Sequence, residues 1–374
     1  MDEYIPCCEP ISDSIILEEI ESLVLRYSLS LDKSGGFAPT CTVVICTRNR
    51  PEQLERCLAT VSCLEYPRFD VLVVDNAPSD EAARDIAARS GAHYIIEPTV
   101  GLSRARNRGA RACKSEIVAY LDDDALPDRG WLTGLAREFE DPKVMAVTGR
   151  TFALKLGPEA ERLCALFGSG ETGGPQWRKV DRQTPSWFEL ANFGGIGDGN
   201  MAFRRCAFDL WPGFEERLGR GVTLDGGEEH HAFFSLIDRG HSVVYTPHAV
   251  MYHPCPQTMR DLRARHLRDL VASTGYITLL FVEEPRYRGR LIKYVVEALQ
   301  GTRRTWRHPV GASSLRIVPR WRMVLAYLYG SLLYLRSRLV RTPSVSLIRR
   351  ESAVLHELEL HSLEKPAQPK TSAN

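Results

Sequence analysis

The chain has 374 residues, of which 44% are hydrophobic and 25% charged, so it can bury a sizeable core. A formal net charge of +1 argues against a general nucleic-acid binder, because such proteins carry a strongly basic surface. The ten cysteines include no C-x-x-C pair, which predicts neither a zinc site nor a disulfide framework and suits a reducing cytosol. We expect no signal peptide, and no apolar run approaches the roughly 18–20 residues of a spanning helix.

The first two thirds of the chain alternate short apolar runs with segments of helical periodicity. After a preamble over residues 1–38, which includes one amphipathic helix, this alternation predicts an α/β fold with a mostly parallel sheet flanked by helices. The predicted strands cover residues 41–46, 71–74, 93–96, 117–121, 144–148, 243–245 and 249–252.

Three adjacent carboxylates, Asp122, Asp123 and Asp124, follow the central apolar run. Such acids repel one another unless a cation or hydrogen-bond donors lie among them. Hard divalent cations take carboxylate oxygens, and Mg2+ usually combines one or two carboxylates with substrate phosphates. The triplet therefore predicts a site for a divalent cation, Mg2+ or Mn2+. The alternative is a helix-capping loop whose acids face water.

Polar residues also stand at the carboxyl ends of other predicted strands, where ligands bind in parallel sheets. Thr47 and Arg48 follow the first strand, and Asp75 closes the second, where its carboxylate can accept from a base or a ribose. On the helix that precedes the acid triplet, Arg106 is a candidate to face phosphate charge, with Asn107 beside it as a donor-side candidate. The alternative for these two residues is an ordinary solvated helix face.

Four sequence blocks together resemble a known family. TVVICTRNRP, VLVVDNAPSD, GLSRARNRGA and YLDDDALP are similar to the nucleotide-sugar half of family 2 glycosyltransferases of the GT-A fold. The resemblance implies a GT-A-like domain over residues 39–255. It further implies that Asp122 and Asp124 form a D-x-D motif that holds the cation on the donor diphosphate, with Asp124 the direct ligand. Thr47 and Asp75 would line the nucleoside pocket, with the other polar residues named above on the donor side.

Two further positions follow from the same resemblance. The stretch GGIGDGNMAFRR would shape the floor near the transferred sugar, with Asp198 and Asn200 as sugar contacts. His253, after the last predicted strand, resembles the third metal-side position of the family. A lone histidine is also common as a structural residue.

Glu228 and Glu229 follow two glycines at the start of a predicted helix. Acids there gain from the helix dipole, so capping is one reading. The family usually has Glu-Asp here, with the second acid as the catalytic base, which assigns the base to Glu229. Glu229 has a longer side chain than the usual aspartate. Either the pocket compensates for the extra methylene, or Glu228 is the base, or activity is weak.

The segment 155–190 is predicted to be irregular, and Trp177, Trp187 and Phe188 lie in it. These aromatic side chains either stack on a sugar or a lipid head, or simply pack in the core.

The composition changes after residue 255. Residues 256–363 are predicted to form a helical, arginine-rich extension, and residues 364–374 a disordered tail. The apolar run 321–335 has arginine and aromatic flanks, which favour contact with a membrane interface. A helical subdomain or a dimer surface is the alternative.

We therefore expect a metal-dependent inverting glycosyltransferase in glycan, glycolipid or cell-surface polysaccharide synthesis. Its expected partners are a nucleotide-sugar donor, with UDP favoured, a glycan or lipid-linked acceptor, and a membrane surface, but no nucleic acid. The expected location is cytoplasmic, peripheral at the inner face of the membrane. One alternative is a degenerate nucleotide-sugar-binding scaffold, because Glu228 and Glu229 stand where the family usually has Glu-Asp. The other is a sugar-phosphate nucleotidyltransferase, which would need a Gly-rich basic signature where this chain has TRNRP.

Overall fold

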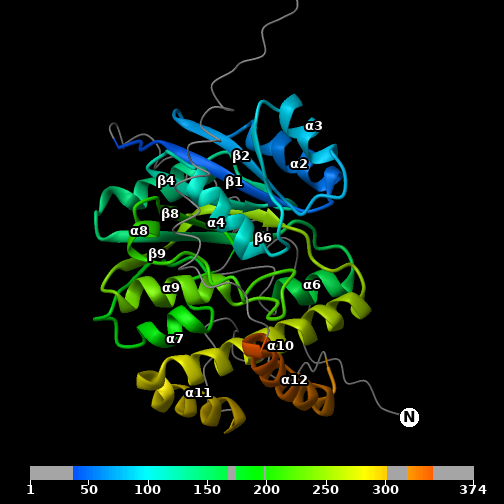
Figure 1. Ribbon diagram of the computed structural model, residues 1–374, viewed down its shortest axis with the longest axis vertical. Helices are drawn as coiled ribbons and strands as arrows, with labels where there is room; N and C mark the ends of the chain where they lie inside the picture. Colours follow the sequence, from blue (N-terminus) through cyan, green and yellow to red (C-terminus); the bar gives the residue numbers. More distant parts are fainter. Residues whose placement is uncertain (1–36, 167–173, 198, 301–317, 340–374) are drawn as a thin grey trace, which may run out of the picture.

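The computed structural model describes residues 37–166, 174–197, 199–300 and 318–339, which form a central sheet with helices on both faces and a layer of C-terminal helices (Figure 1). Almost all of the predicted preamble 1–38 lies outside these ranges. So do the predicted tail 364–374 and Asp198.

In the described part of the chain, nine strands form one sheet in the order β3-β2-β1-β4-β8-β6-β9-β5, with β7 added on β9. Strands β1 to β4 pair in parallel, as do β6 and β9, whereas β8 pairs antiparallel with β4 and β6. The α/β class with flanking helices and a helical C-terminal part is confirmed, and the sheet is mixed. The strands are β1 (Cys41–Thr47), β2 (Phe69–Asn76), β3 (His93–Glu97), β4 (Ile117–Asp122), β5 (Leu126–Pro127), β6 (Val144–Ala153), β7 (Arg178–Val180), β8 (Met201–Arg204) and β9 (Ser242–His253).

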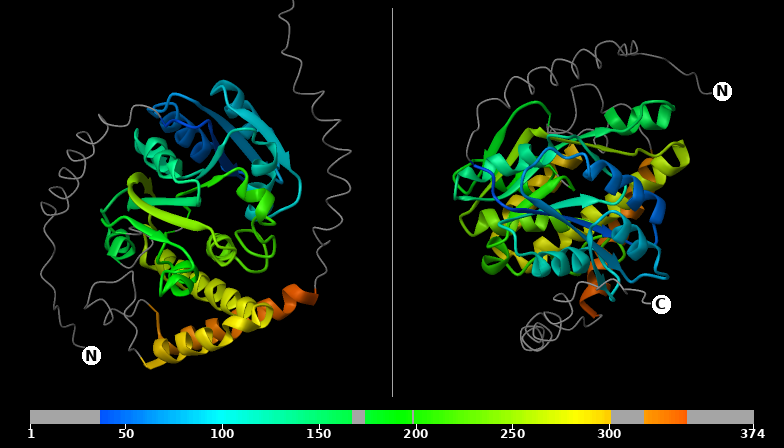
Figure 2. Two further views of the ribbon diagram at one scale, coloured as in Figure 1. Left: turned by 90° about the vertical axis from the view of Figure 1, so that its left-hand side faces the viewer. Right: turned by 90° about the horizontal axis from the view of Figure 1, so that it is seen from above.

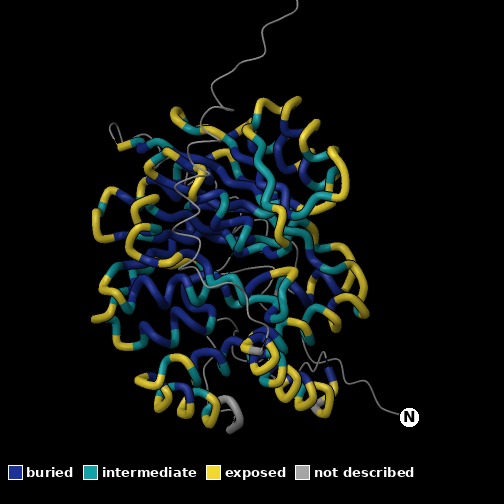
Figure 3. Tube along the Cα trace, viewed as in Figure 1, coloured by how far each residue is buried: buried dark blue, intermediate teal, exposed yellow. Residues whose placement is uncertain are grey.

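Both faces of the sheet are buried, because successive side chains of a strand point to opposite faces and each face is covered by helices (Figures 2 and 3). In β1, Val43 and Ile45 pack towards α2 and α5, whereas Val44 packs towards the opposite core that includes α9. The helices are α2 (Pro51–Val61), α3 (Ala82–Arg89), α4 (Leu102–Ala112), α5 (Trp131–Ala136), α6 (Glu159–Leu166), α7 (Trp187–Asn192), α8 (Ala207–Leu210), α9 (Glu228–Asp238), α10 (Met259–Glu283), α11 (Arg288–Gln300) and α12 (Arg320–Leu339), with short 3-10 turns at Arg137–Glu140 and Pro285–Tyr287.

Two local predictions were wrong. The two short strands expected around Pro247 are one strand, β9, which continues because a register shift against β6 accommodates the irregularity. The segment 155–190, expected to be irregular, contains α6, β7 and the start of α7 in its described part. These elements are too short to show a clear periodicity, and packing stabilises them: Trp187 and Phe188 are buried against Phe234.

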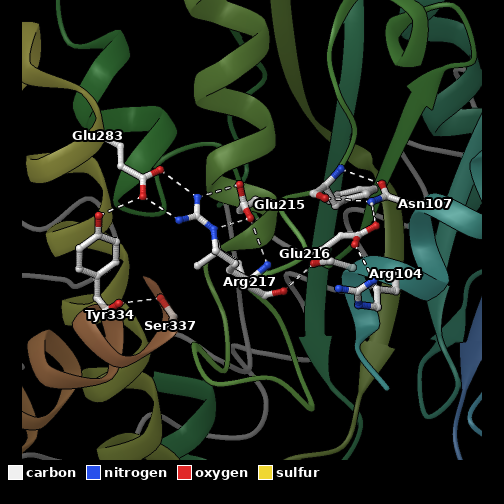
Figure 4. A network of polar contacts seen from close by, with 11 residues as sticks. Arg104, Asn107, Glu215, Glu216, Arg217, Glu283, Tyr334 and Ser337 are labelled. Atoms are coloured by element: carbon white, nitrogen blue, oxygen red, sulfur yellow. Dashed lines mark hydrogen bonds and ion pairs between the residues drawn. The ribbon is translucent and has the colours of Figure 1, made fainter. Parts of the chain in front are cut away.

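The C-terminal helices are tied to the sheet domain by a network of ion pairs (Figure 4). Arg217, in the loop before α9, forms a bidentate pair with Glu283 at the end of α10, at 2.7 and 2.8 Å, and also bonds Glu215. Tyr334 of α12 donates to the same Glu283 at 3.0 Å. Because bidentate arginine–carboxylate pairs hold geometry well, this network positions α10 and α12 relative to the loop that leads to α9.

Candidate active site

A cavity of about 940 Å³ lies at the carboxyl ends of the parallel strands, between the sheet and α10. One wall carries the acids of the strand ends and of α9, and α10 and α11 contribute to the opposite wall. Among the predicted site residues, the cavity is lined by Thr47, Arg48, Arg106, Asp122, Asp123, Asp124, Glu228, Glu229 and His253.

Strand register explains why the strand-end residues meet. Thr47 of β1 stands opposite Asp75 of β2, and Cys46 stands opposite Asp122 of β4. The next residues turn tightly, since the amide of Ala125 donates to the carbonyl of Asp122 at 3.1 Å. The carboxylates of the triplet therefore leave the sheet at one edge, as the sequence predicted.

The middle acid of the triplet turns back towards β1. Asp123 accepts from the hydroxyl of Thr47 at 2.7 Å and from Arg50 at 3.2 Å. Burial raises the pKa of Asp123 to about 6, and the Thr47 bond partly opposes this shift. The hydrogen bond that Thr47 donates to Asp123 thus stabilises the turn.

The outer acids, Asp122 and Asp124, lie with His253 in an arrangement that suits a metal ion. One ligand atom from each residue lies within 4.8 Å of the others. Ligands bound at about 2.1 Å to one ion lie roughly 3–4 Å apart, so small side-chain rotations would bring the three together. His253 comes into reach because β5, directly after the triplet, pairs with the end of β9.

The hydrogen bonds of His253 also suit a ligand role. Its Nδ1–H faces the carbonyl of Pro254 at 2.8 Å, which directs Nε2 towards Asp124 at 3.2 Å. Metal-bound histidines usually donate their second ring N–H in this way. Burial opposes charge on His253, but the bond to Asp124 outweighs it and raises the pKa of the imidazole. A metal cation bound between His253 and Asp124 would take the place of the proton that Nε2 otherwise shares with Asp124.

Arg106 joins the metal-side acids to the glutamate pair. Its side chain is 2% exposed, and its guanidinium lies 3.0 Å from Glu228, 2.9 Å from Glu229 and 3.5 Å from Asp122. Burial disfavours the charge, but the two glutamates outweigh it, so the pKa of Arg106 is raised. Because this one buried guanidinium contacts three carboxylates, it holds the acid of β4 and the acids of α9 in a fixed position relative to one another.

The two glutamates differ in environment. Glu228 has a 3% exposed side chain and a buried Oε2 without a hydrogen-bond partner, whereas the side chain of Glu229 is 15% exposed. Burial and then the neighbouring Glu229 raise the pKa of Glu228. For Glu229, Arg106 outweighs burial and keeps the pKa below its usual value. Glu229 is therefore the ionised, more accessible carboxylate.

Three other predicted donor contacts lie outside the lining of this cavity. Asp75 is buried and accepts from Tyr94 at 2.8 Å, while its second oxygen is buried without a hydrogen-bond partner. Burial raises the pKa of Asp75. Asn107 bonds both backbone groups of Phe214 and so holds that loop on α4.

The third residue outside the lining, Asn200, is fully buried. Its side chain accepts from Trp131 at 2.7 Å and donates to the carbonyls of Arg150 and Ala249. These bonds link β6, β9 and α5 at the start of β8. The structure thus shows a structural role for Asn200, and its predicted contact with the sugar stays a prediction.

Sequence reasoning missed several cavity residues. Arg50, within the TRNRP turn, donates to both Asp123 and Asp124 at 3.2 Å. On α10, Arg265, Arg268 and Tyr276 also line the cavity. The helical spacing of these α10 residues was visible in the sequence, but which face of α10 would meet the sheet domain was not.

Known proteins resemble this chain mainly over the predicted donor half. Residues 42–209 match the family model described as glycosyl transferase family 2. The pre-mycofactocin glycosyltransferase of Mycobacterium tuberculosis is 31% identical over 238 residues, which cover 62% of this chain and 46% of that protein. The succinoglycan biosynthesis protein ExoM of Rhizobium meliloti is 27% identical over 226 residues, or 58% of this chain and 68% of that protein.

A mannosyltransferase from Pyrobaculum calidifontis, solved in complex with GDP-Man and Mn2+, aligns over 91% of this chain and 90% of that chain, at 18% identity and a TM-score of 0.48. The chain spans about half the length of the mycobacterial relative. The family match covers the predicted donor half, from β1 to α8. Over residues 42–209 the chain is therefore similar in sequence to glycosyl transferase family 2.

Proposed function

We propose that this protein transfers a sugar from a nucleotide sugar to an acceptor hydroxyl, with inversion and with a divalent cation. The observation that carries the proposal is Arg106, which joins Asp122 of the D-x-D motif to Glu228 and Glu229 within one cavity. A donor diphosphate at the first site and an acceptor hydroxyl at the second would then be held at a fixed separation.

Asp122, Asp124 and His253 would hold the cation, Mg2+ or Mn2+. When bound, the cation stabilises the negative charge of the departing diphosphate. Asp123 and Arg50 keep the turn that carries the two outer acids in place. Thr47, Arg48 and Asp75 would lie on the nucleoside side, with UDP as the favoured nucleotide.

Glu229 would take the proton from the acceptor hydroxyl as the hydroxyl attacks the anomeric carbon. A general base must be ionised and reachable, and Glu229 meets both conditions better than the buried Glu228. Arg106 acts as a positioning residue, because it holds Glu229 beside the metal-side acids. The buried Glu228 contacts Arg106 from the interior and so helps to hold the guanidinium in place.

We also propose that α12 contacts a membrane surface, with the protein at its cytoplasmic face. Only a narrow stripe of α12 packs against α10, where Gly330 meets Gly275 closely. The rest of α12 exposes large apolar side chains, and Arg336 and Arg338 are exposed near its end. Most of this helix has the colour of exposed residues in Figure 3. Such a helix lies in the interface rather than across the bilayer. In the described residues, no helix is both long and apolar enough to span a membrane.

The acceptor would accordingly be a glycan or a lipid-linked glycan precursor, as used in glycolipid or cell-surface polysaccharide synthesis. The test of the function is a panel of UDP-, GDP- and dTDP-sugars, with Mn2+ or with EDTA. A donor at 100 times its Kd should stabilise the fold by about 2.7 kcal/mol. We expect one donor class to raise the melting temperature with Mn2+ and to release nucleotide. If a donor binds but no nucleotide is released with any acceptor tested, the protein is better described as a nucleotide-sugar-binding scaffold.

A further inference from the structure

A second, smaller cavity of about 260 Å³ lies between α10 and α11. Its one hydroxyl-bearing lining residue, Thr278, donates to the carbonyl of Thr274 at 2.8 Å. Every other side chain that lines it is apolar, so the cavity offers a chain of carbon atoms an environment without competing polar groups. We call it the α10–α11 groove, and its apolar lining is Ile277, Phe281, Leu291, Ile292, Val295 and Val296.

The groove adjoins the active-site cavity on both of its helices. On α10, Ile277 lines both spaces. On α11, Tyr294 lines the active-site cavity and the next residue, Val295, lines the groove. The preceding residue of α10, Tyr276, packs against Gly227, the residue before the glutamate pair. A molecule in the groove would therefore have one end at the active site.

The outer wall of the groove leaves apolar side chains open to water. Ile292, Val295 and Val296 of α11 are 54%, 40% and 43% exposed. Exposed apolar surface marks a protein, membrane or ligand contact, and the adjoining active-site cavity favours a ligand here. The groove is narrow, at about 260 Å³, and this space is enough for a single extended hydrocarbon chain.

We propose that the α10–α11 groove binds the apolar chain of an amphipathic acceptor, whose hydroxyl-bearing head lies in the active-site cavity. The role of the head rests on the glycosyl transfer proposed above. Binding of the chain rests only on the groove. The acceptor class is thus a glycosylatable head group joined to one alkyl or isoprenoid chain, rather than a free soluble glycan.

The experiment measures binding of hexyl, octyl and decyl glucosides, each below its micelle concentration, to the full-length protein by calorimetry. Each methylene that leaves water should tighten binding about fourfold, so each two-carbon step should lower the Kd about 16-fold until the groove is filled. An affinity that does not change with chain length would overturn the proposal.

Two matched variants locate the site. Val296→Gln places an amide in the groove, while Val324→Gln makes the same change on α12, outside it. Both valines are exposed, at 43% and 55%, so neither change should disturb folding. We expect the chain-length dependence to be lost in the first variant and kept in the second. Equal loss in both variants, or none in the first, would refute the assignment.

Two further measurements separate this proposal from its alternatives. If the wild type forms a dimer that Val296→Gln abolishes in sedimentation, the groove is filled by a second copy and the proposal is wrong. The melting shift caused by a nucleotide sugar with Mn2+ should be the same in Val296→Gln and in the wild type. Failure of every donor in the wild type would count against glycosyl transfer, whereas the alkyl glucoside result would still decide the groove.

Discussion

Replacing Glu229 by glutamine tests the proposed base directly, because the change keeps size and polarity but removes the proton acceptor. General-base catalysis typically contributes about 10²–10⁴ in rate, or roughly 3–5.5 kcal/mol of transition-state free energy. We therefore expect Glu229→Gln to slow nucleotide release from the donor by that factor, with acceptor or with water as the attacking group. Donor affinity should hardly change, since the cation ligands Asp122, Asp124 and His253 are untouched.

The structure predicts that this variant stays folded. Arg106 keeps Glu228 at 3.0 Å and Asp122 at 3.5 Å. The charge of Glu229 helps to raise the pKa of Glu228, so its removal lets Glu228 ionise and pair with Arg106. The glutamine oxygen still accepts a hydrogen bond, and the difference between a charged and a neutral acceptor is about 1 kcal/mol. The melting temperature should fall by a few degrees at most.

Glu228→Gln is the matched comparison, with the same substitution one residue earlier. Because Glu228 is buried and its pKa is raised, a neutral amide imitates its protonated form, and most of the rate should remain. The assay is initial-rate nucleotide release at saturating donor and Mn2+, with melting curves for each variant. If Glu228→Gln is inactive while Glu229→Gln is near normal, the base is Glu228. If both keep their rate, these acids are structural and the proposed mechanism is refuted.

Three further predictions follow from the same geometry. Asp124→Ala, or EDTA, should abolish nucleotide release while the melting curve without donor is retained; full activity in EDTA would exclude metal dependence. The raised pKa of Glu228 means that the native state holds a proton that the unfolded state loses, so this group's stabilising contribution should be complete below pH 4.5 and decline up to about pH 8. Urea unfolding in EDTA should show that decline in the wild type and a flatter profile in Glu228→Gln; identical profiles would contradict the burial argument. Leu328→Glu on α12, which is 60% exposed, should weaken binding to anionic vesicles, whereas the control Leu210→Glu on α8, at 49%, should not; equal binding by both variants would remove the membrane proposal.

The sequence determined the local features of this protein. β-branched runs such as residues 41–46 specify buried strands, and the polar residues after them are at the carboxyl ends wherever those strands pair in parallel. The acid triplet and the glutamate pair were likewise recognisable, because their chemistry depends on adjacent residues. These are short-range signals, and the α/β fold class follows from them.

Only the tertiary structure decided which of these residues meet. Arg106 looked like a phosphate-binding residue on a helix face, yet it pairs with Glu228, which is 122 residues away in sequence. Asp124 and His253 come together because β5 pairs with β9 in one register, and a shift of one residue would turn the side chains of β9 to the other face. The side of α10 that closes the cavity is set by how α10 packs on the sheet domain, since its hydrophobic periodicity alone does not say which surface it covers.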